Sequence, residues 1–113
     1  MKVEVIDLEF GQPTVREAGA RLMTELVFAR RRGVRVLKLI HGYGSSGRGG
    51  KLRKALRRML HELEGTGSVR LVVIGEAWSI FDQASRTLMD RYPELRNDLD
   101  LDRANAGITL VEL

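Results

Sequence analysis

Residues 34–60, VRVLKLIHGYGSSGRGGKLRKALRRML, decide the fold of this chain. Five of the first seven residues are apolar, which is typical of a central strand that is covered on both faces of its sheet. The leucines that follow residue 50 recur at intervals of three and four, and this spacing predicts a helix from about residue 50 to residue 64. Between the two lies a loop with five glycines in nine residues, 42–50. The stretch therefore predicts a buried strand, a tight turn and an amphipathic helix.

The flanking sequence predicts further strands and helices. Runs of β-branched and apolar residues favour strands near 3–8, 69–74 and 108–113. Thr14 and Glu17 have the spacing of a capping box, so a helix is expected to begin there and to end before Gly33. The predicted order is βαβαβαβ. We therefore expect one compact α/β domain over residues 1–113, with a central, mostly four-stranded mixed sheet flanked by helices.

The helix that precedes the last strand is predicted at 79–91, and Pro93 marks its end. Its inward-facing residues are expected to include Ile80 and Leu88. Trp78 and Phe81 are predicted to anchor this helix to the sheet. The polar and acidic segment that follows, 94–106, is predicted to be a loop.

The composition excludes several classes of protein. The chain has no cysteine, which rules out disulfides and thiolate metal sites. The N-terminus does not have the pattern of a signal peptide, and no apolar run approaches the roughly 20 residues that span a bilayer. We therefore expect a soluble, cytoplasmic protein that does not contact membranes, and we expect it to be a monomer.

Charge is strongly segregated along the chain. Residues 26–61 contain eleven basic residues and no acidic one, although the net charge of the whole protein is only +4. Segregation of this kind suggests a surface that faces a polyanion, because solubility alone is served by mixed signs. A solvated basic face without a specific partner is the alternative.

The glycine-rich loop and the helix after it have the chemistry of a phosphate site. Glycines let a backbone approach a ligand closely, and a helix N-terminus presents free amides and partial positive charge. Serine hydroxyls and cationic side chains add further donors, so phosphate is the anion that these features favour together. The candidate contacts are Gly42, Tyr43, Gly44, Ser45, Ser46, Gly47, Arg48, Lys51, Arg53, Lys54, Arg57 and Arg58. Tyr43 is expected either to stack on a base or ribose, or to pack against the loop.

Two known nucleotide motifs fit this loop poorly. Gly42, Gly44 and Gly47 match the dinucleotide pattern G-x-G-x-x-G, but the chain is too short for two mononucleotide halves. The P-loop pattern fails because Leu52 stands where a serine or threonine is needed to hold magnesium. A nucleotide cofactor is therefore disfavoured.

Three polar residues are candidates for chemistry at the carboxyl ends of the first two strands, which is where open α/β sheets place their ligands. They are Asp7, Glu9 and His41. His41 has the side chain of a general acid or base or of a phosphate donor, and the two carboxylates are candidate ligands for Mg²⁺ or Mn²⁺. The structural alternatives are that Asp7 caps the turn after its strand and that Glu9 is merely solvated.

The passage 39–53, with its His-Gly-x-Gly block, resembles the small MutS-related (Smr) domain. The opening segment 6–18 and the closing segment 105–113 look like that family's first strand and helix and its last strand. The resemblance implies a compact α/β domain that binds DNA or RNA. It also implies nicking or RNA-cleaving endonuclease activity, often dependent on a metal, and fusion to a larger repair protein is common in the family.

One family feature is altered here. The family's opening motif is Leu-Asp-x-His-Gly, and this chain reads Ile6-Asp7-Leu8-Glu9-Phe10, so Glu9 replaces the histidine. Three functions therefore remain open. The first is an endonuclease acting on structured DNA or RNA, the second is a DNA- or RNA-binding domain that does not cleave, and the third is a binder or enzyme for a small phosphate-bearing ligand.

Overall fold

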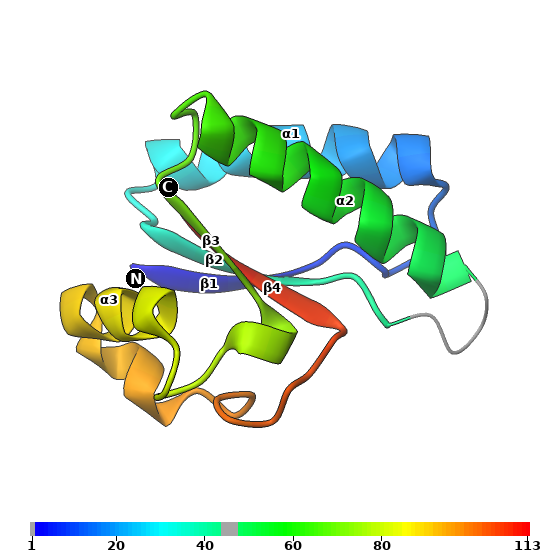
Figure 1. The fold of residues 1–113 in the computed structure, drawn as a ribbon. Coiled ribbons are helices and arrows are strands. Elements are labelled where there is room, and N and C mark those ends of the chain that lie inside the picture. Colours follow the sequence, from blue (N-terminus) through cyan, green and yellow to red (C-terminus); the bar gives the residue numbers. More distant parts are fainter. Residues whose placement is uncertain (1, 44–47) are drawn as a thin grey trace.

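The computed structural model of the 113-residue chain describes residues 2–43 and 48–113. Its α-helices are α1 (Val15–Arg31), α2 (Arg48–Gly65) and α3 (Gln83–Arg91), and its strands are β1 (Val3–Asp7), β2 (Val36–Ile40), β3 (Leu71–Ile74) and β4 (Ile108–Glu112). Two short 3-10 helices, η1 (Gly75–Ala77) and η2 (Pro93–Asn97), flank α3. The predicted βαβαβαβ order is confirmed (Figure 1).

The four strands form one mixed sheet in the order β1-β2-β4-β3. β1 and β2 are parallel, whereas β4 runs antiparallel to both of its neighbours. α1 and α2 cover one face of the sheet, and α3 with the 3-10 helices covers the other (Figure 1). β2 is therefore a central strand covered on both faces, as its apolar sequence predicts.

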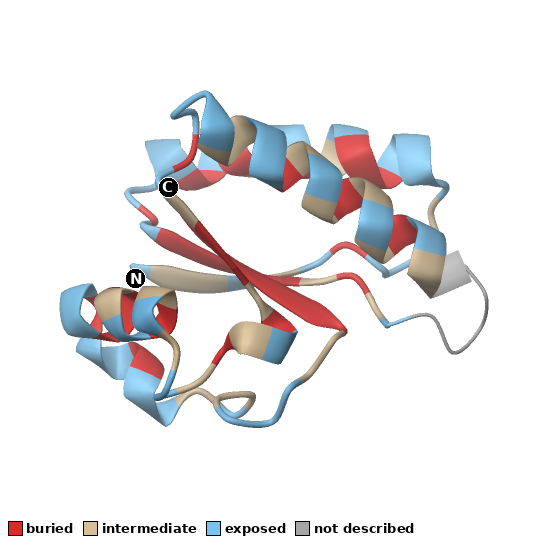
Figure 2. Ribbon diagram, in the orientation of Figure 1, coloured by how far each residue is buried: buried red, intermediate tan, exposed pale blue. Residues whose placement is uncertain are grey.

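Each face of the sheet has its own hydrophobic core. Leu37 and Leu39 of β2 pack with Leu56 on the face that α1 and α2 cover. Val36 points the other way and packs with Trp78. Figure 2 shows the resulting buried stripes on the sheet and on the inner sides of the helices. Within the described ranges, no helix has the length and apolar character needed to cross a membrane.

α1 begins as predicted. Thr14 accepts a hydrogen bond from the amide of Glu17, and the Glu17 carboxylate accepts one from the amide of Thr14, which completes the capping box. The helix ends at Arg31, and Gly33 follows with φ of 77°, a left-handed conformation that glycine adopts without strain. Both ends of α1 therefore carry the local signals that the sequence predicts.

α3 begins later than predicted. The Asp82 side chain accepts a hydrogen bond from the amide of Ser85 at 2.9 Å and so caps the helix, which leaves residues 79–82 outside it. Ile80 is therefore 46% exposed and Phe81 83% exposed, and the predicted inward positions of these two residues are wrong. Trp78 is fully buried, as predicted.

A buried lysine anchors the segment after α3. Lys38 of β2 points toward the α3 face and forms ion pairs with Asp98 and Asp100. Burial opposes its charge, but hydrogen bonds to the two carboxylates outweigh that effect and raise the pKa of Lys38. Asp98 also accepts a hydrogen bond from the Trp78 indole at 3.0 Å. The segment predicted as a loop is thus tied to the sheet, and its first residues form η2 instead.

Candidate functional site

The candidate site lies where β1 and β2 end together. Asp7 of β1 pairs with Ile40 of β2, so both strands finish at the same edge of the sheet. The amides of His41 and Gly42 both donate to the carbonyl of Gly107 just before β4, at 3.0 and 3.1 Å. These two bonds fix residues 41 and 42 against the segment that leads into β4.

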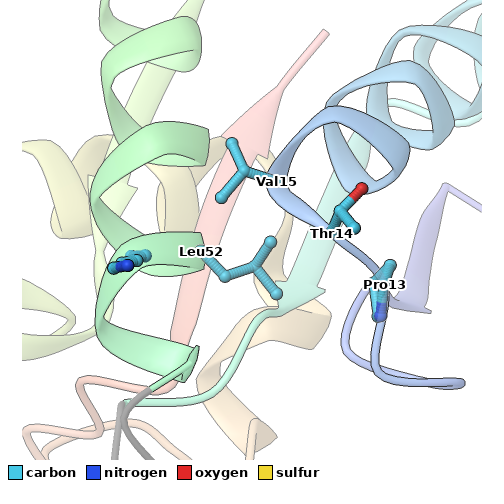
Figure 3. A pocket seen from close by; sticks show the side chains of 5 residues that line it. Pro13, Thr14, Val15 and Leu52 are labelled. Carbon is cyan, nitrogen blue, oxygen red and sulfur yellow. The ribbon is translucent and has the colours of Figure 1, made fainter.

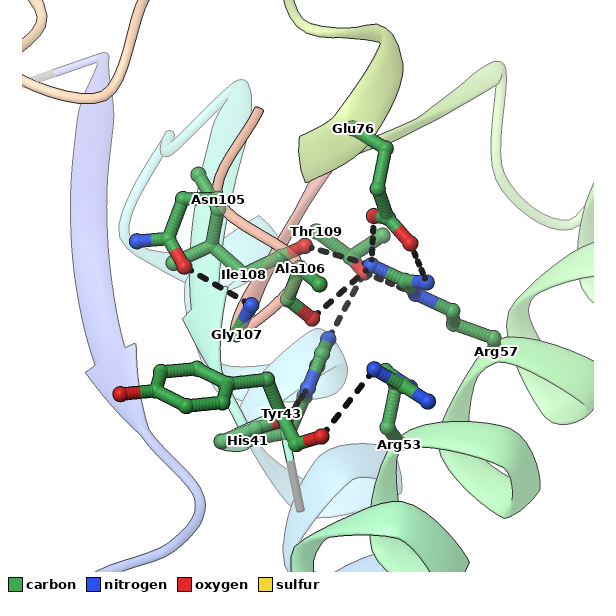
Figure 4. Close-up of polar contacts among 11 residues, drawn as sticks. His41, Tyr43, Arg53, Arg57, Glu76, Asn105, Ala106, Gly107, Ile108 and Thr109 are labelled. Atoms are coloured by element: carbon green, nitrogen blue, oxygen red, sulfur yellow. Dashed lines mark hydrogen bonds and ion pairs between the residues drawn. The ribbon is translucent and has the colours of Figure 1, made fainter. Parts of the chain in front are cut away.

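We call the place where residues 41–43 leave β2 beside Gly107 the corner. His41 is fully buried there, and both ring nitrogens have partners. Nδ1 lies 2.8 Å from the carbonyl oxygen of Gly42, which can only accept, so Nδ1 carries the proton of the neutral ring. Nε2 lies 2.9 Å from Oγ1 of Thr109. In the neutral ring protonated on Nδ1, Nε2 is the acceptor, so the Thr109 hydroxyl donates to it while accepting from Arg57 Nε at 3.1 Å. We call this run of three hydrogen bonds the Arg57–Thr109–His41 chain (Figure 4).

Electrostatics agree with a neutral His41. Burial is the largest influence and lowers the pKa of this imidazole. The hydrogen bond to Gly42 opposes the shift, while the positive charges of Arg57 and Arg53 add to it. A neutral ring with both nitrogens occupied positions the backbone here, and in this arrangement it offers no free nitrogen to a phosphate or a reacting group.

Arg57 is a structural cross-link in this conformation. Besides Thr109, its guanidinium binds both carboxylate oxygens of Glu76, at 2.6 and 2.9 Å, and the carbonyls of Ala106 and Ile108, at 3.2 and 3.0 Å. Its side chain is only 13% exposed. The hydrogen bonds from Arg57 lower the pKa of Glu76 and hold that carboxylate ionised. The sequence predicts that the Arg57 side chain projects from α2 toward a polyanion. In the structure this side chain points instead toward the ends of the strands.

Arg53 and Tyr43 form the outer side of the same corner. Arg53 is half-buried, and its Nη1 donates to the carbonyl of Tyr43 at 3.1 Å. The Tyr43 ring is 61% exposed and lies beside Gly107, where an added Cβ would come within 3.0 Å of ring atom Cδ1. Gly107 thus leaves room for the ring at the surface.

The two predicted carboxylates have different surroundings. Asp7 Oδ1 accepts hydrogen bonds from the amides of Glu9 and Phe10, at 2.9 and 3.0 Å, and so caps the turn after β1. Glu9 is exposed, and its carboxylate lies against Gly42. A Cβ on Gly42 would be 2.6 Å from Glu9 Oε2, and Gly42 also has a φ of 79°. The structure therefore brings Glu9 to the corner next to His41.

The described residues do not build a metal site from protein side chains alone. In residues 2–43 and 48–113, no three side chains of the types His, Cys, Asp and Glu converge as metal ligands would. One oxygen of Asp7 is already occupied by two backbone amides. Mg²⁺ is usually held by one or two carboxylates together with waters and substrate phosphates, so a metal ion at Asp7 and Glu9 stays a prediction.

Three cations of α2 face the solvent. Lys51, Lys54 and Arg58 are exposed and follow one another at helical intervals of three and four, which places them on one side of the helix. None of the ion pairs formed by the described residues includes them. We call this set the α2 cationic stripe. Several other predicted contacts lie outside the described residues: Gly44, Ser45, Ser46, Gly47 and the side chain of Arg48.

A shallow hollow separates the starts of α1 and α2. Its walls are Pro13, Thr14, Val15, Lys51 and Leu52, and Figure 3 shows Val15 and Leu52 on opposite sides of it. The Thr14 hydroxyl is used by the capping box, so Lys51 supplies the one charge in this lining. The hollow gives the edge its shape but has little polar chemistry of its own.

Comparison with known proteins identifies the family. A model of the Smr domain matches residues 6–77. The chain belongs to the Smr domain family. The crystal structure of the Smr domain of MutS2 from Thermus thermophilus has the same fold, with a TM-score of 0.59 and 24% sequence identity over 97% of this chain and 96% of that one. No curated protein sequence gives a significant match.

Membership places the described corner in a known context. Smr domains are known for nucleic-acid binding and nicking endonuclease activity. The family match contains the end of β1 and all of β2 and α2, the elements that build the corner and carry the α2 cationic stripe. The rest of the Smr fold, from α3 to β4, supplies Thr109 and the carbonyls that hold Arg57.

Replacing Arg57 tests its role in the scaffold. Arg57→Ala removes the bonds to Glu76 and Thr109 and should lower the free energy of unfolding by about 2–4 kcal/mol, because hydrogen-bonded groups are left without their charged partner. Arg58→Ala, one position along the helix and exposed, should change it by less than about 0.5 kcal/mol. Urea unfolding of both variants measures the difference. Similar small losses in the two variants would contradict the assignment.

Proposed function

We propose that this Smr domain binds DNA or RNA by holding the phosphate backbone against the α2 cationic stripe, next to the corner at Gly42. The observation that carries the proposal is the division among the cations of α2. Arg53 and Arg57 form hydrogen bonds within the scaffold, whereas Lys51, Lys54 and Arg58 are left exposed and outside the ion pairs of the described residues. Family membership supports the same conclusion.

The surrounding charge favours a polyanion over a single small anion. No acidic residue occurs between residues 26 and 61, so nothing in that stretch neutralises the stripe. Three cations along one side of a helix are suited to successive phosphates of a polynucleotide. We further propose that the glycine, serine and arginine residues of 44–48 contact phosphate, because they immediately precede or begin α2, where helix amides favour anions.

Removing charge from the stripe should change the salt dependence of binding. The double variant Lys54→Gln/Arg58→Gln should weaken oligonucleotide binding and lower the slope of log K against log salt by about two, since each lost phosphate contact releases about one fewer counterion. Fluorescence anisotropy of labelled DNA and RNA over a salt series gives both quantities.

The control for this experiment is Arg86→Gln/Arg103→Gln, which removes the same charge from exposed positions outside the corner. It should keep the wild-type slope. Equal losses in the two double variants would show that net charge, and not this surface, drives binding. A wild-type protein that retains no oligonucleotide even at low salt would refute the proposal and favour a small phosphate-bearing ligand.

Nicking of nucleic acid is a second candidate function. It is favoured by the position of Glu9, an exposed carboxylate that lies against Gly42 at the proposed phosphate-binding edge. A carboxylate so placed is suited to accept a proton from an attacking water. It is also the residue that replaces the histidine of the family's opening motif. Asp7 and His41 would then position the turn and the corner around it.

A plasmid assay tests this second function. If the domain nicks supercoiled DNA, Glu9→Gln should slow the reaction by about a hundredfold or more, the size of a general-base contribution, without abolishing binding. Glu94→Gln, an exposed carboxylate on the other layer, should nick as the wild type does. The reaction is run with Mg²⁺, with Mn²⁺ and with chelator. No nicking by the wild type under any of these conditions would remove this function and leave binding alone.

A further inference from the structure

Two exposed aromatic residues stand at the same edge of the sheet. Phe10 is 76% exposed and Tyr43 is 61% exposed. Each lies three residues beyond the paired strand ends Asp7 and Ile40, so both rings leave the chain just past the carboxyl ends of neighbouring parallel strands. Large exposed apolar side chains at one place usually mark an interaction site.

The backbones that carry the two rings are close together. Glu9, next to Phe10, contacts Gly42, which is next to Tyr43, because a Cβ on Gly42 would meet the Glu9 carboxylate at 2.6 Å. In Figure 4 the Tyr43 ring points away from Arg53 and Arg57, toward the side on which β1 ends. The two aromatic residues therefore lie on adjoining segments at the same edge of the sheet.

Both backbones are also held in place. Asp7 accepts a hydrogen bond from the amide of Phe10, and Arg21 donates to the carbonyl of Phe10 at 2.9 Å. Arg53 donates to the carbonyl of Tyr43 at 3.1 Å. Rings presented from a fixed backbone lose little conformational entropy when a planar group stacks on them.

Fixed aromatic rings beside exposed cations are the combination that binds single-stranded nucleic acid. The rings stack on bases while the cations follow the phosphates. In a duplex the base faces are already stacked on one another, so rings of this kind have nothing to stack on. Phe81 is another exposed aromatic residue, and it lines a separate hollow with Glu76 and Asp102.

We infer that this edge selects unpaired nucleotides of DNA or RNA, with Phe10 and Tyr43 stacking on bases while the α2 cationic stripe holds the adjoining phosphates. This inference rests on the proposed function and specifies its substrate class. Phe10 occupies the position of a glycine in the family's opening motif, so the ring is a feature of this chain.

Three probes separate stacking from charge. They are a single-stranded oligonucleotide that carries 2-aminopurine, the fully paired duplex of the same sequence, and heparin, a polyanion without bases. DNA and RNA versions of the single strand are both used. The wild type should prefer either single strand to its duplex, and binding should quench or otherwise change the 2-aminopurine fluorescence.

Four variants test the rings. Phe10→Ala and Tyr43→Ala should each weaken single-strand binding about fivefold or more, as expected for the loss of one stacked base, while heparin retention stays unchanged. Tyr43→Phe keeps the ring and should bind as the wild type does. Phe81→Ala is the control for loss of an exposed aromatic side chain and should also bind as the wild type does.

The outcomes distinguish this inference from the proposed function. Equal wild-type affinity for single strand and duplex, or unchanged single-strand binding in Phe10→Ala and Tyr43→Ala, would overturn the inference and leave the proposed function standing. Parallel losses of heparin and oligonucleotide binding in the alanine variants would overturn it too, because stacking cannot affect heparin. Failure of the wild type to bind heparin or any nucleic acid would refute the proposed function itself.

Discussion

The Arg57–Thr109–His41 chain is the interaction on which the functional edge depends. It joins α2, β4 and the end of β2 in a region where an unpaired polar group would be costly. Its hydrogen bonds have a single consistent direction: Arg57 donates to Thr109, Thr109 donates to His41, and His41 donates to the carbonyl of Gly42. Within the described part of the chain, no buried side-chain polar atom is left without a partner. The Arg57–Thr109–His41 chain of hydrogen bonds therefore specifies one arrangement of the corner.

The same constraint divides the cations of α2 by their position around the helix. Leucines face the core, and the two arginines four residues apart, Arg53 and Arg57, meet the acceptors at the ends of the strands. Lys51, Lys54 and Arg58 follow on the opposite side and remain in solvent. One amphipathic helix thus supplies both the scaffold of the corner and the charge that we propose binds phosphate. Counting the basic residues of α2 does not reveal this division, because Arg53 and Arg57 are used by the fold.

Sequence predicts this structure well wherever the signals are local. The capping box at Thr14, the end of α1 at Gly33 and the burial of β2 follow from neighbouring residues. The inward turn of Arg57 does not, because its partners Glu76 and Thr109 are 19 and 52 residues away. Lys38 meets Asp98 across 60 residues for the same reason. The start of α3 depends on a cap at Asp82 that competes with the apolar pattern around Ile80. Pairings between polar and charged groups that are far apart in the sequence are thus what could not be predicted at this site.

The sequence position of His41 makes it a candidate for chemistry, and the structure places it in a buried, hydrogen-bonded setting. Its ring is buried, both nitrogens are occupied, and burial together with the nearby arginines lowers its pKa below the usual 6.5. Nitrogen-15 NMR of the His41 ring tests this setting most directly. We expect a neutral ring protonated on Nδ1 at pH 7, and a ring that remains neutral as the pH falls through 6.5. An imidazolium at pH 6.5, or a neutral ring protonated on Nε2, would contradict it.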